Sequence, residues 1–215
     1  ADQIIPMSYY DTGDPEDLWA WMAAYEKKTG GRMLAIPHNG NLSNGLMFDE
    51  VTLLAKKPLD RDYAQRRARW EPLYEVTQMK GTGEAHPLLS PRDEFANFEV
   101  WDKGQLGPAP KTKEMLPREY AREALKRGMA YEAAVEPSTD PIRFDEVIGG
   151  IGGKPEVYQF ARQTSAAGLA AVWSRDNTRE ALWDAMYRRE VYGTSGTRLV
   201  VRVFAGYDFS AKDLE

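Results

Sequence analysis

The residues of this chain that could do chemistry include its two histidines, His38 and His86. His38 closes the apolar run RMLAIPH and leads into the polar loop NGNLSNG, whereas His86 lies in the loop GTGEAHPLLSP. Carboxylate and amide side chains lie near them in the sequence: Asn39, Asn41, Asp49, Glu50, Glu75 and Glu84. Neutral imidazole and carboxylate are ligands suited to Zn, Mn or Fe. A metal site assembled from several loops is one interpretation; two loop histidines hydrogen-bonded to backbone are the other.

Other chemistries find less support in the sequence. The chain has no cysteine, which excludes disulfides, thiolate metal sites and cysteine nucleophiles. It contains no Walker A motif, no G-x-G-x-x-G after a strand and no G-x-S-x-G elbow. The run GGIGG at 149–153 lacks the lysine and the preceding strand of a phosphate-binding loop. A Ser–His–Asp triad stays open, although no serine has an elbow context, and the catalytic residues are therefore unassigned.

Composition limits the class of protein. Hydrophobic residues make up 42% of the 215 residues and charged residues 28%, as in ordinary globular proteins. The net charge of −5 argues against a nucleic-acid partner, whose binding surface would be basic. No apolar run of about 18 residues predicts a transmembrane helix. We therefore expect a soluble protein, with the compartment open between cytoplasm and periplasm.

Four helices are expected to position these residues. The clearest is DPEDLWAWMAAYEKKTGG, in which Asp14 is a good N-cap, Pro15 suits the first turn and Gly30 or Gly31 ends the helix. A second, charged helix ends before Pro72, and a third is predicted over residues 112–133. The fourth is DNTREALWDAMYRREVYG, where Asn177 and Glu180 resemble a capping box.

Strands are expected between these helices. RMLAIPH, LYEVTQMKG and residues 198–206 each read as a strand, whereas SAAGLAAVW fits either a strand or a helix. Residues 134–156 are rich in Gly and Pro and are predicted to be a flexible loop or junction. Because helices and strands alternate, we predict an α/β fold with a largely parallel sheet or barrel. Functional groups of such folds gather beyond the carboxyl ends of the strands, where His38 and the Glu84–His86 loop would lie.

Several long blocks of the sequence resemble a known bacterial family. They are PEDLWAWMAAYEKKTGGRMLAIPHNGNLSNGLMF, RARWEPLYEVTQMKGTGEAHPLLSPRDEFANFEVWD, EYAREALKRGMAYEA and SAAGLAAVWSRDNTREALWDAMYRREVYGTSGTRLVVRVFAGYDF. On these blocks the chain is identified as a member of domain-of-unknown-function family 3604. That family is similar to the PHP (polymerase and histidinol phosphatase) superfamily, whose members are distorted (β/α)7 barrels that bind divalent metals and hydrolyse phosphoesters.

The resemblance implies a fold, a cofactor and a set of site residues. It implies part of a distorted PHP-like (β/α)7 barrel, with mostly parallel strands and flanking helices, as a single partial domain over 1–215. It implies a divalent metal, Zn, Mn or Fe, and a small-molecule or phosphoester substrate. His38 resembles the metal-contacting histidine of the PHP proteins, and Glu84 and His86 match a characteristic block of the family. Asn39 and Asn41 would hold the loop or the substrate.

Two departures from the family pattern weaken the implied activity. The amino-terminal portion with a His-x-His strand is absent, and the motif Gly-Ser-Thr-Asp-x-His is reduced to Ser138, Thr139 and Asp140 without the histidine. Asp140 is thus a further candidate ligand, and a stretch near 134–162 looks lost. If the chain is complete, we expect weak or no metal binding and negligible phosphoesterase activity. The alternative is a non-catalytic fragment or interaction module that needs a partner, including a second copy, to complete the barrel, since unpaired edge strands seek partners.

Overall fold

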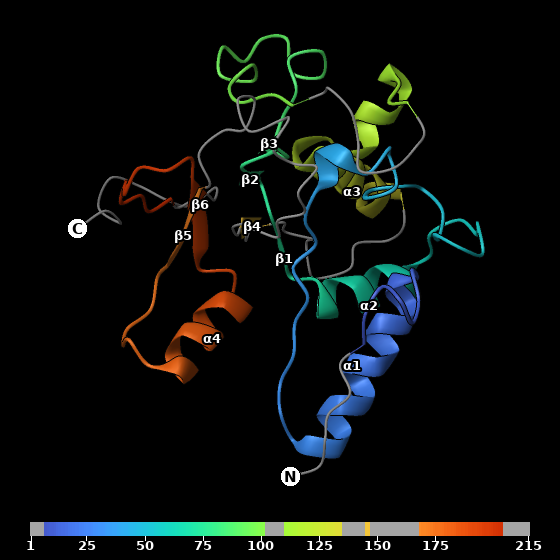
Figure 1. Cartoon of the computed structure of the whole chain (residues 1–215), viewed down its shortest axis with the longest axis vertical. Helices are drawn as coiled ribbons and strands as arrows, with labels where there is room; N and C mark the ends of the chain where they lie inside the picture. Colours follow the sequence, from blue (N-terminus) through green and yellow to red (C-terminus); the bar gives the residue numbers. More distant parts are fainter. Residues whose placement is uncertain (1–6, 102–109, 135–144, 147–167, 204–215) are drawn as a thin grey trace.

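The helices and short strands of the protein come from four parts of the chain. The computed structural model describes residues 7–101, 110–134, 145–146 and 168–203. Its helices are α1 (Pro15–Thr29), η1 (Gly40–Leu42), α2 (Arg61–Trp70), η2 (Lys113–Arg118), α3 (Ala121–Ala134) and α4 (Arg179–Tyr187), where η marks a 3-10 helix. Its strands are β1 (Leu73–Tyr74), β2 (Thr77–Gln78), β3 (Gly81–Thr82), β4 (Asp145–Glu146), β5 (Leu169–Val172) and β6 (Val191–Thr194). Figure 1 shows α1 below α2, α3 above it, and α4 with β5 and β6 to the left.

The predicted barrel of mostly parallel strands is wrong. The described strands form three two-stranded sheets, of which β1–β4 is parallel and β2–β3 and β5–β6 are antiparallel. These strands are only two to four residues long, and each pairs with one neighbour. A closed barrel needs every strand paired on both sides. The described strands therefore form no closed barrel, and the structure over these residues is a mixed α/β arrangement.

The expected strand at 32–38 contains no regular strand. The segment runs beside β1 with two backbone hydrogen bonds, from Ala35 N to Trp70 O (2.7 Å) and from Glu75 N to Pro37 O (3.1 Å). Pro37 has no N–H to donate, so a continuous ladder is interrupted there. The expected strand LYEVTQMKG is split into β1 and β2. β2 then returns directly into β3 as a hairpin, which can only be antiparallel.

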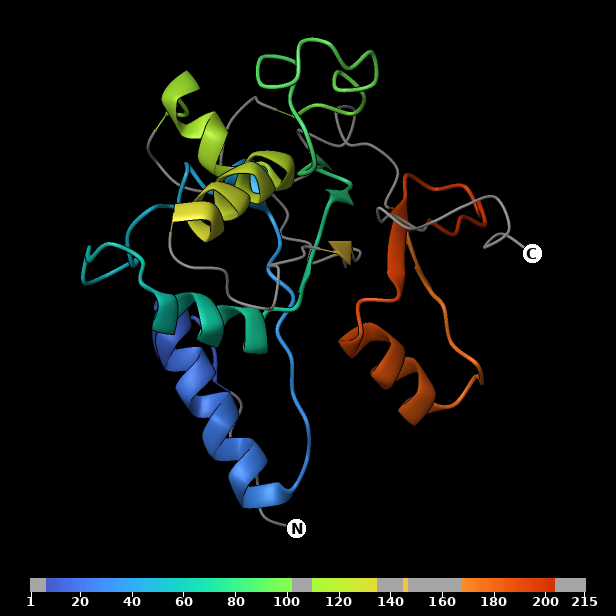
Figure 2. The same ribbon diagram turned by 180° about the vertical axis from the view of Figure 1, so that it is seen from behind.

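Both ends of α1 confirm the sequence prediction of an Asp14 cap and a glycine stop. The Asp14 side chain accepts a hydrogen bond from Glu16 N (3.0 Å), and Gly30 adopts φ 70° while its N–H donates to Glu26 O. Its most buried side chains are Trp19 and Met22, each 1% exposed. They pack against α2, which crosses one end of α1 (Figure 2). This helix pair forms one of the two apolar clusters found among the described residues.

The helix predicted over 112–133 is broken in two. Pro117 lies inside η2, and α3 begins only at Ala121. Proline removes a backbone donor and disfavours a continuous α-helix. The first N–H groups of α3, at Ala121 and Arg122, donate to Gly83 O (2.9 Å) and Glu84 O (3.0 Å). The start of α3 is therefore anchored to the loop after β3.

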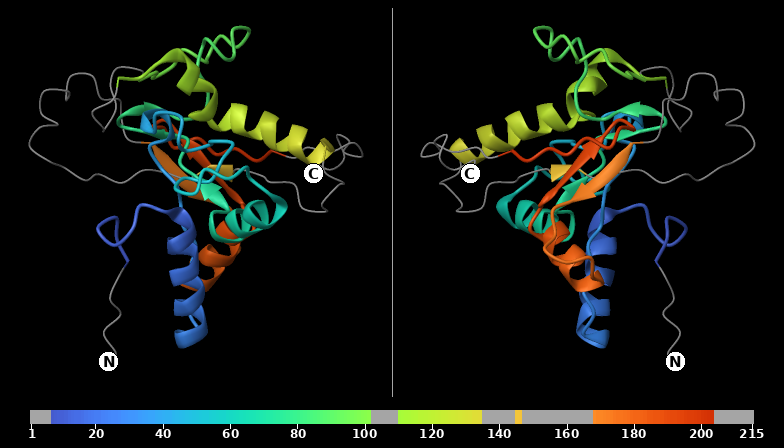
Figure 3. Two further views of the ribbon diagram at one scale, coloured as in Figure 1. Left: turned by 90° about the vertical axis from the view of Figure 1, so that its right-hand side faces the viewer. Right: turned by 90° about the vertical axis from the view of Figure 1, so that its left-hand side faces the viewer.

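The elements after residue 168 confirm some of the remaining secondary-structure predictions and contradict others. SAAGLAAVW contributes the strand β5, and α4 is capped by Thr178 rather than by Asn177. The strand predicted at 198–206 is wrong over 198–203, because the structure has no strand there; residues 204–206 lie outside the described part. Most of the predicted loop at 134–156 also lies outside it. Figure 3 shows α1 and α4 below the short strands.

Two arginines connect α4 to the amino-terminal part. Arg32 forms an ion pair with Asp184 (2.8 Å), and Arg69 lies over the Tyr187 ring, 5.6 Å from its centroid. Both contacts are partly exposed, so they set the position of α4 more than its stability. Among the helices that the structure describes, none combines the length and the apolar character that a membrane span requires.

Candidate functional site

His38 lies at the end of the segment that runs beside β1. Its side chain is exposed, and the residue before it, Pro37, accepts a hydrogen bond from Glu75 N (3.1 Å). This bond brings the end of the 32–38 segment to the residue that follows β1. Asn39 turns the chain away with φ 60°, a left-handed conformation that asparagine tolerates better than most residues. His38 and Glu75 therefore both lie at the edge formed where the 32–38 segment and β1 end, although 37 positions separate them in the sequence.

Glu75 is a buried carboxylate held by neutral donors. It is 3% exposed, and its Oε2 accepts hydrogen bonds from Asn39 N (3.1 Å) and from Gln78 Nε2 (2.8 Å). The same Gln78 amide donates to Asn39 Oδ1 (2.8 Å) and closes a three-residue network. Burial raises the pKa of Glu75, while the Asn39 N–H, His38 and Lys80 oppose the rise. Such a group favours a cation beside it.

Lys80 is the nearest counter-charge to this carboxylate within the hairpin. Partial burial lowers the pKa of Lys80, and the charge of Glu75 acts in the opposite direction. The backbone carbonyl of Lys80 accepts a hydrogen bond from Asn41 Nδ2 (2.9 Å). The site therefore combines an exposed imidazole, a buried carboxylate and an amine on one edge.

The loop that carries His38 is packed tightly onto Tyr74. A Cβ placed on Gly40 would lie 1.8 Å from Tyr74 Oη, and one on Gly83 would lie 2.8 Å from the same atom. Two loops thus approach the tyrosine from different parts of the sequence. Tyr74 is 1% exposed, so this contact is interior and fixes the loop rather than binding a ligand.

Asn41 is also committed to holding the loop. It is 1% exposed, and its backbone carbonyl accepts a hydrogen bond from Lys111 Nζ (2.7 Å). Lys111 forms a buried ion pair with Glu119 (2.9 Å). Burial raises the pKa of Glu119, while Lys111 opposes the rise. Of the two functions considered for Asn39 and Asn41, their contacts in the structure serve the loop; binding of substrate stays a prediction.

The other sequence-predicted ligands lie in a different setting. Glu84 forms an ion pair with Arg122 of α3, and Arg122 also pairs with Asp93. His86 is 2% exposed, packs against the Tyr120 ring at 5.3 Å between centroids, and accepts a hydrogen bond from Leu88 N at Nδ1 (3.2 Å). A metal at Glu84 would therefore compete with a guanidinium, whereas one at His86 would have to reach a buried ring.

Few metal donors converge within the described part of the chain. Over those residues, no group of three or more His, Cys, Asp or Glu side chains could hold a metal ion. Asp140 lies outside the described residues. The hydrogen bonds of Glu75 to Pro37 and Asn39, the two neighbours of His38, bring the donor side chains His38 and Glu75 to the edge where β1 ends.

Sequence reasoning named Glu75 only as a neighbour of the histidines and missed Gln78 and Lys80. The available signal was a carboxylate directly after the apolar pair Leu73–Tyr74, which β1 buries completely. A charged residue that continues a buried strand is rarely a simple packing residue. Its partners come from β2, three residues later, and from a loop 36 positions earlier, and that pairing requires the tertiary structure.

Comparison with known proteins identifies one family. The family model described as "Protein of unknown function (DUF3604)" matches residues 1–152 and 135–215. The two matches together span the chain and do not indicate a lost stretch near 134–162. No curated protein and no solved structure matches the chain.

Proposed function

The chain belongs to the DUF3604 family, and from its site we propose that it contributes to a divalent-metal-dependent hydrolase of phosphoesters. The observation that carries the proposal is the Glu75 carboxylate, 3% exposed and fixed by Asn39 N and Gln78 Nε2 at the edge where His38 is exposed. A hydrogen-bonded carboxylate next to an accessible imidazole is a donor set of the kind that Zn, Mn and Fe use.

The two donors differ in how firmly they are held. Glu75 is oriented by two hydrogen bonds to one oxygen, which leaves its other oxygen with acceptor capacity. His38 follows Pro37, whose ring restricts the backbone at that point. Such orientation by neighbouring groups tunes a metal ligand. These residues therefore fit a metal, as two of the three or more protein ligands that a catalytic site needs.

Each residue would have a distinct function in the hydrolysis. A bound metal would lower the pKa of a water molecule and so supply hydroxide near neutral pH. Asn39 and Gln78 hold the carboxylate, and the Lys80 ammonium provides positive charge for an anionic substrate. Gly40 and Asn41 hold the loop that presents His38.

The test is metal binding by the 215-residue chain and its variants. With two donors, we expect weak Zn or Mn binding, measured by calorimetry and by elemental analysis after dialysis. His38→Ala and Glu75→Gln should each weaken it about tenfold or more. Glu94→Gln is the matched control, because Glu94 is an exposed carboxylate in the loop after β3, and it should change nothing.

The outcomes separate the site from the activity. Metal binding that is equal in the wild type and in both site variants would refute the assignment of His38 and Glu75. Hydrolysis of a generic phosphodiester should be negligible for this chain and should appear only in a protein that supplies the missing ligands. Wild-type metal binding together with hydrolysis that survives His38→Ala would refute the proposed mechanism.

A further inference from the structure

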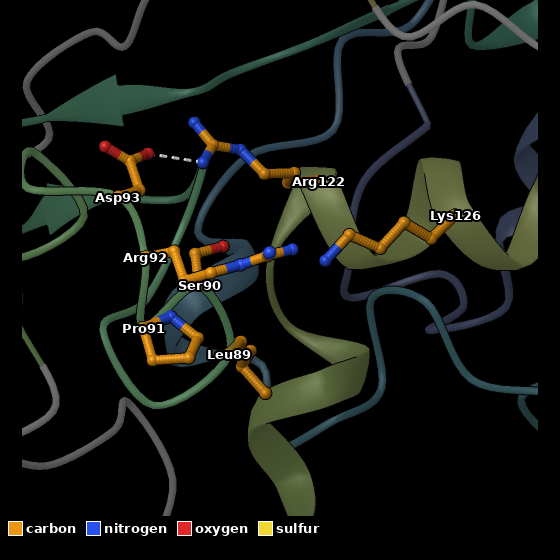
Figure 4. Close-up of a pocket in the computed structure, with 7 residues that line it drawn as sticks. All are labelled: Leu89, Ser90, Pro91, Arg92, Asp93, Arg122 and Lys126. Carbon is orange, nitrogen blue, oxygen red and sulfur yellow. Dashed lines mark hydrogen bonds and ion pairs between the residues drawn. The ribbon is translucent and has the colours of Figure 1, made fainter.

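A cavity of about 320 Å³ lies between the loop after β3 and the first turns of α3 (Figure 4). Its walls are residues 89–93 of the loop and Arg122 and Lys126 of the helix. The loop is built as a tight turn, because Leu89 N and Ser90 N both donate to His86 O (2.9 Å each). Its volume is at the lower end of the range of about 300–1,000 Å³ usual for small-molecule sites.

The charged residues of this cavity are mostly basic. Its lining has three cationic side chains and one carboxylate, whereas the whole chain has a net charge of −5. That carboxylate, Asp93, is already engaged at both oxygens: Oδ2 accepts from Arg122 and Oδ1 accepts from Phe95 N (2.9 Å). Asp93 therefore adds little repulsion to an incoming anion.

Arg122 lines the cavity with a side chain that two ion pairs hold in place. Its guanidinium donates to Asp93 through Nη1 and to Glu84 through Nη2. The resemblance implied Glu84 and His86 as metal ligands, which stays a prediction; in the structure both residues help to shape this cavity. Glu84 orients Arg122, and the His86 carbonyl closes the turn that carries Ser90.

Arg92 and Lys126 are the exposed cations of the cavity. Both side chains are exposed, and Figure 4 shows their charged ends pointing toward one another across the cavity. Lys126 also pairs with Glu123 of the same helix, whereas Arg92 forms no ion pair with another residue in the described part of the chain. Two like charges facing each other repel, and an anion between them would remove that repulsion.

We propose that this cavity binds a small phosphate monoester, with the phosphoryl group between Arg92 and Lys126. A phosphoryl group carries close to two negative charges at neutral pH and presents several acceptor oxygens, which suits a guanidinium opposite an ammonium. Leu89 and Pro91 provide apolar wall for the organic part, and the Ser90 hydroxyl adds a donor. The site needs no metal, so it is independent of the proposed hydrolase centre.

The experiment is a calorimetric titration of the 215-residue chain with glycerol 3-phosphate, inorganic phosphate and acetate at low ionic strength. We expect saturable binding of the monoester, weaker binding of inorganic phosphate and none of acetate. Arg92→Ala and Lys126→Ala should each weaken monoester binding about tenfold or more, because each removes a charge-assisted hydrogen bond. The controls are Arg61→Ala and Lys27→Ala, which remove exposed cations from α2 and α1 and should leave binding unchanged.

Both side chains are exposed, so their removal should leave the fold intact, and thermal melts of each variant check this. Equal binding by the wild type and the double variant Arg92→Ala/Lys126→Ala would overturn the site. An affinity for inorganic phosphate equal to that for glycerol 3-phosphate would overturn the assignment to a monoester. Absence of saturable binding by the wild type would overturn both.

Discussion

The contact between Gly40 and Tyr74 holds the loop that presents His38, and Gly40→Ala should disrupt it. A Cβ at position 40 would lie 1.8 Å from Tyr74 Oη, 2.9 Å from Tyr74 Cζ and 2.7 Å from the backbone oxygen of Glu119. Ordinary contacts of a Cβ begin near 3.4 Å. The loop must therefore move by more than 1 Å, away from a ring that is 1% exposed.

The expected loss of stability follows from that displacement. Overpacking of a well-packed interior costs about 1–3 kcal/mol, occasionally more, and this overlap belongs at the upper end, about 3 kcal/mol. For a chain of this length that corresponds to a fall in melting temperature of about 6–12 °C. Gly128→Ala is the matched control, since nothing lies within 4 Å of its added Cβ in α3. It should stabilise the protein by about 0.5–1 kcal/mol.

Tyr74→Phe tests whether the hydroxyl is the cause. The Tyr74 hydroxyl is buried and has no hydrogen-bond partner within the described residues, so its removal should change stability by less than about 1 kcal/mol. In the double variant Gly40→Ala/Tyr74→Phe the 1.8 Å overlap disappears, whereas the contact with Glu119 O remains. We therefore expect partial rescue, with a coupling energy of about 1–2 kcal/mol.

Urea unfolding followed by tryptophan fluorescence measures all four proteins. Changes in midpoint at a constant m-value report stability directly. Additivity of the two single variants, within about 0.5 kcal/mol, would refute the proposed clash. A stable Gly40→Ala variant with wild-type midpoint would refute the packing of this loop on Tyr74.

Three further predictions concern the buried interior. Lys111→Met should destabilise the protein by about 3–5 kcal/mol at neutral pH, because it leaves the Glu119 carboxylate buried without its cation. The loss of stability should shrink in acid, where that carboxylate takes up a proton. Urea midpoints at several pH values measure the loss, and a loss independent of pH would contradict the reason given. Burial raises the folded pKa of Glu119 above its ordinary value of 4.5, so its stabilising contribution is complete below 4.5 and is lost as the pH rises through the folded pKa. Glu119→Gln should therefore flatten the decline of the unfolding free energy between pH 4.5 and the folded pKa of Glu119. An unchanged pH profile would show that another group is responsible for the decline. Trp19→Ala should cost about 3–5 kcal/mol, whereas Trp173→Ala at a site 37% exposed should cost much less; equal thermal shifts would contradict the assigned core.

The ends of α1 could be read from the sequence because their causes are local, whereas the start of α3 at Ala121 could not. Asp14 caps α1 with its own side chain, two residues from the N–H that it accepts from, and Gly30 supplies the left-handed residue that ends the helix. α2 ends before Pro72 as predicted. At α4 the same reasoning chose Asn177 where Thr178 is the cap, since both residue types can accept the same hydrogen bond.

The strands could not be read in the same way. Hydrophobic runs predicted strands of a largely parallel sheet at 32–38 and 198–206, yet pairing depends on partners that are distant in the sequence. Pro37 interrupts one run, and Val200 at 79% exposed shows that an apolar run need not be buried. A strand is stabilised by its neighbour's backbone, and the sequence alone does not say which neighbour is present.

The sequence by itself determined the residue types available for chemistry, two histidines without cysteine, together with the caps of α1 and family membership. Only the tertiary structure decided which of those residues meet. It joined Asn39 to Glu75 across 36 positions, and it joined Glu84 across 38 positions to Arg122, which lines a basic cavity. The physical reason is that a cap acts within one turn of its own residue, whereas an ion pair or a buried carboxylate depends on the charge that the folded chain brings beside it.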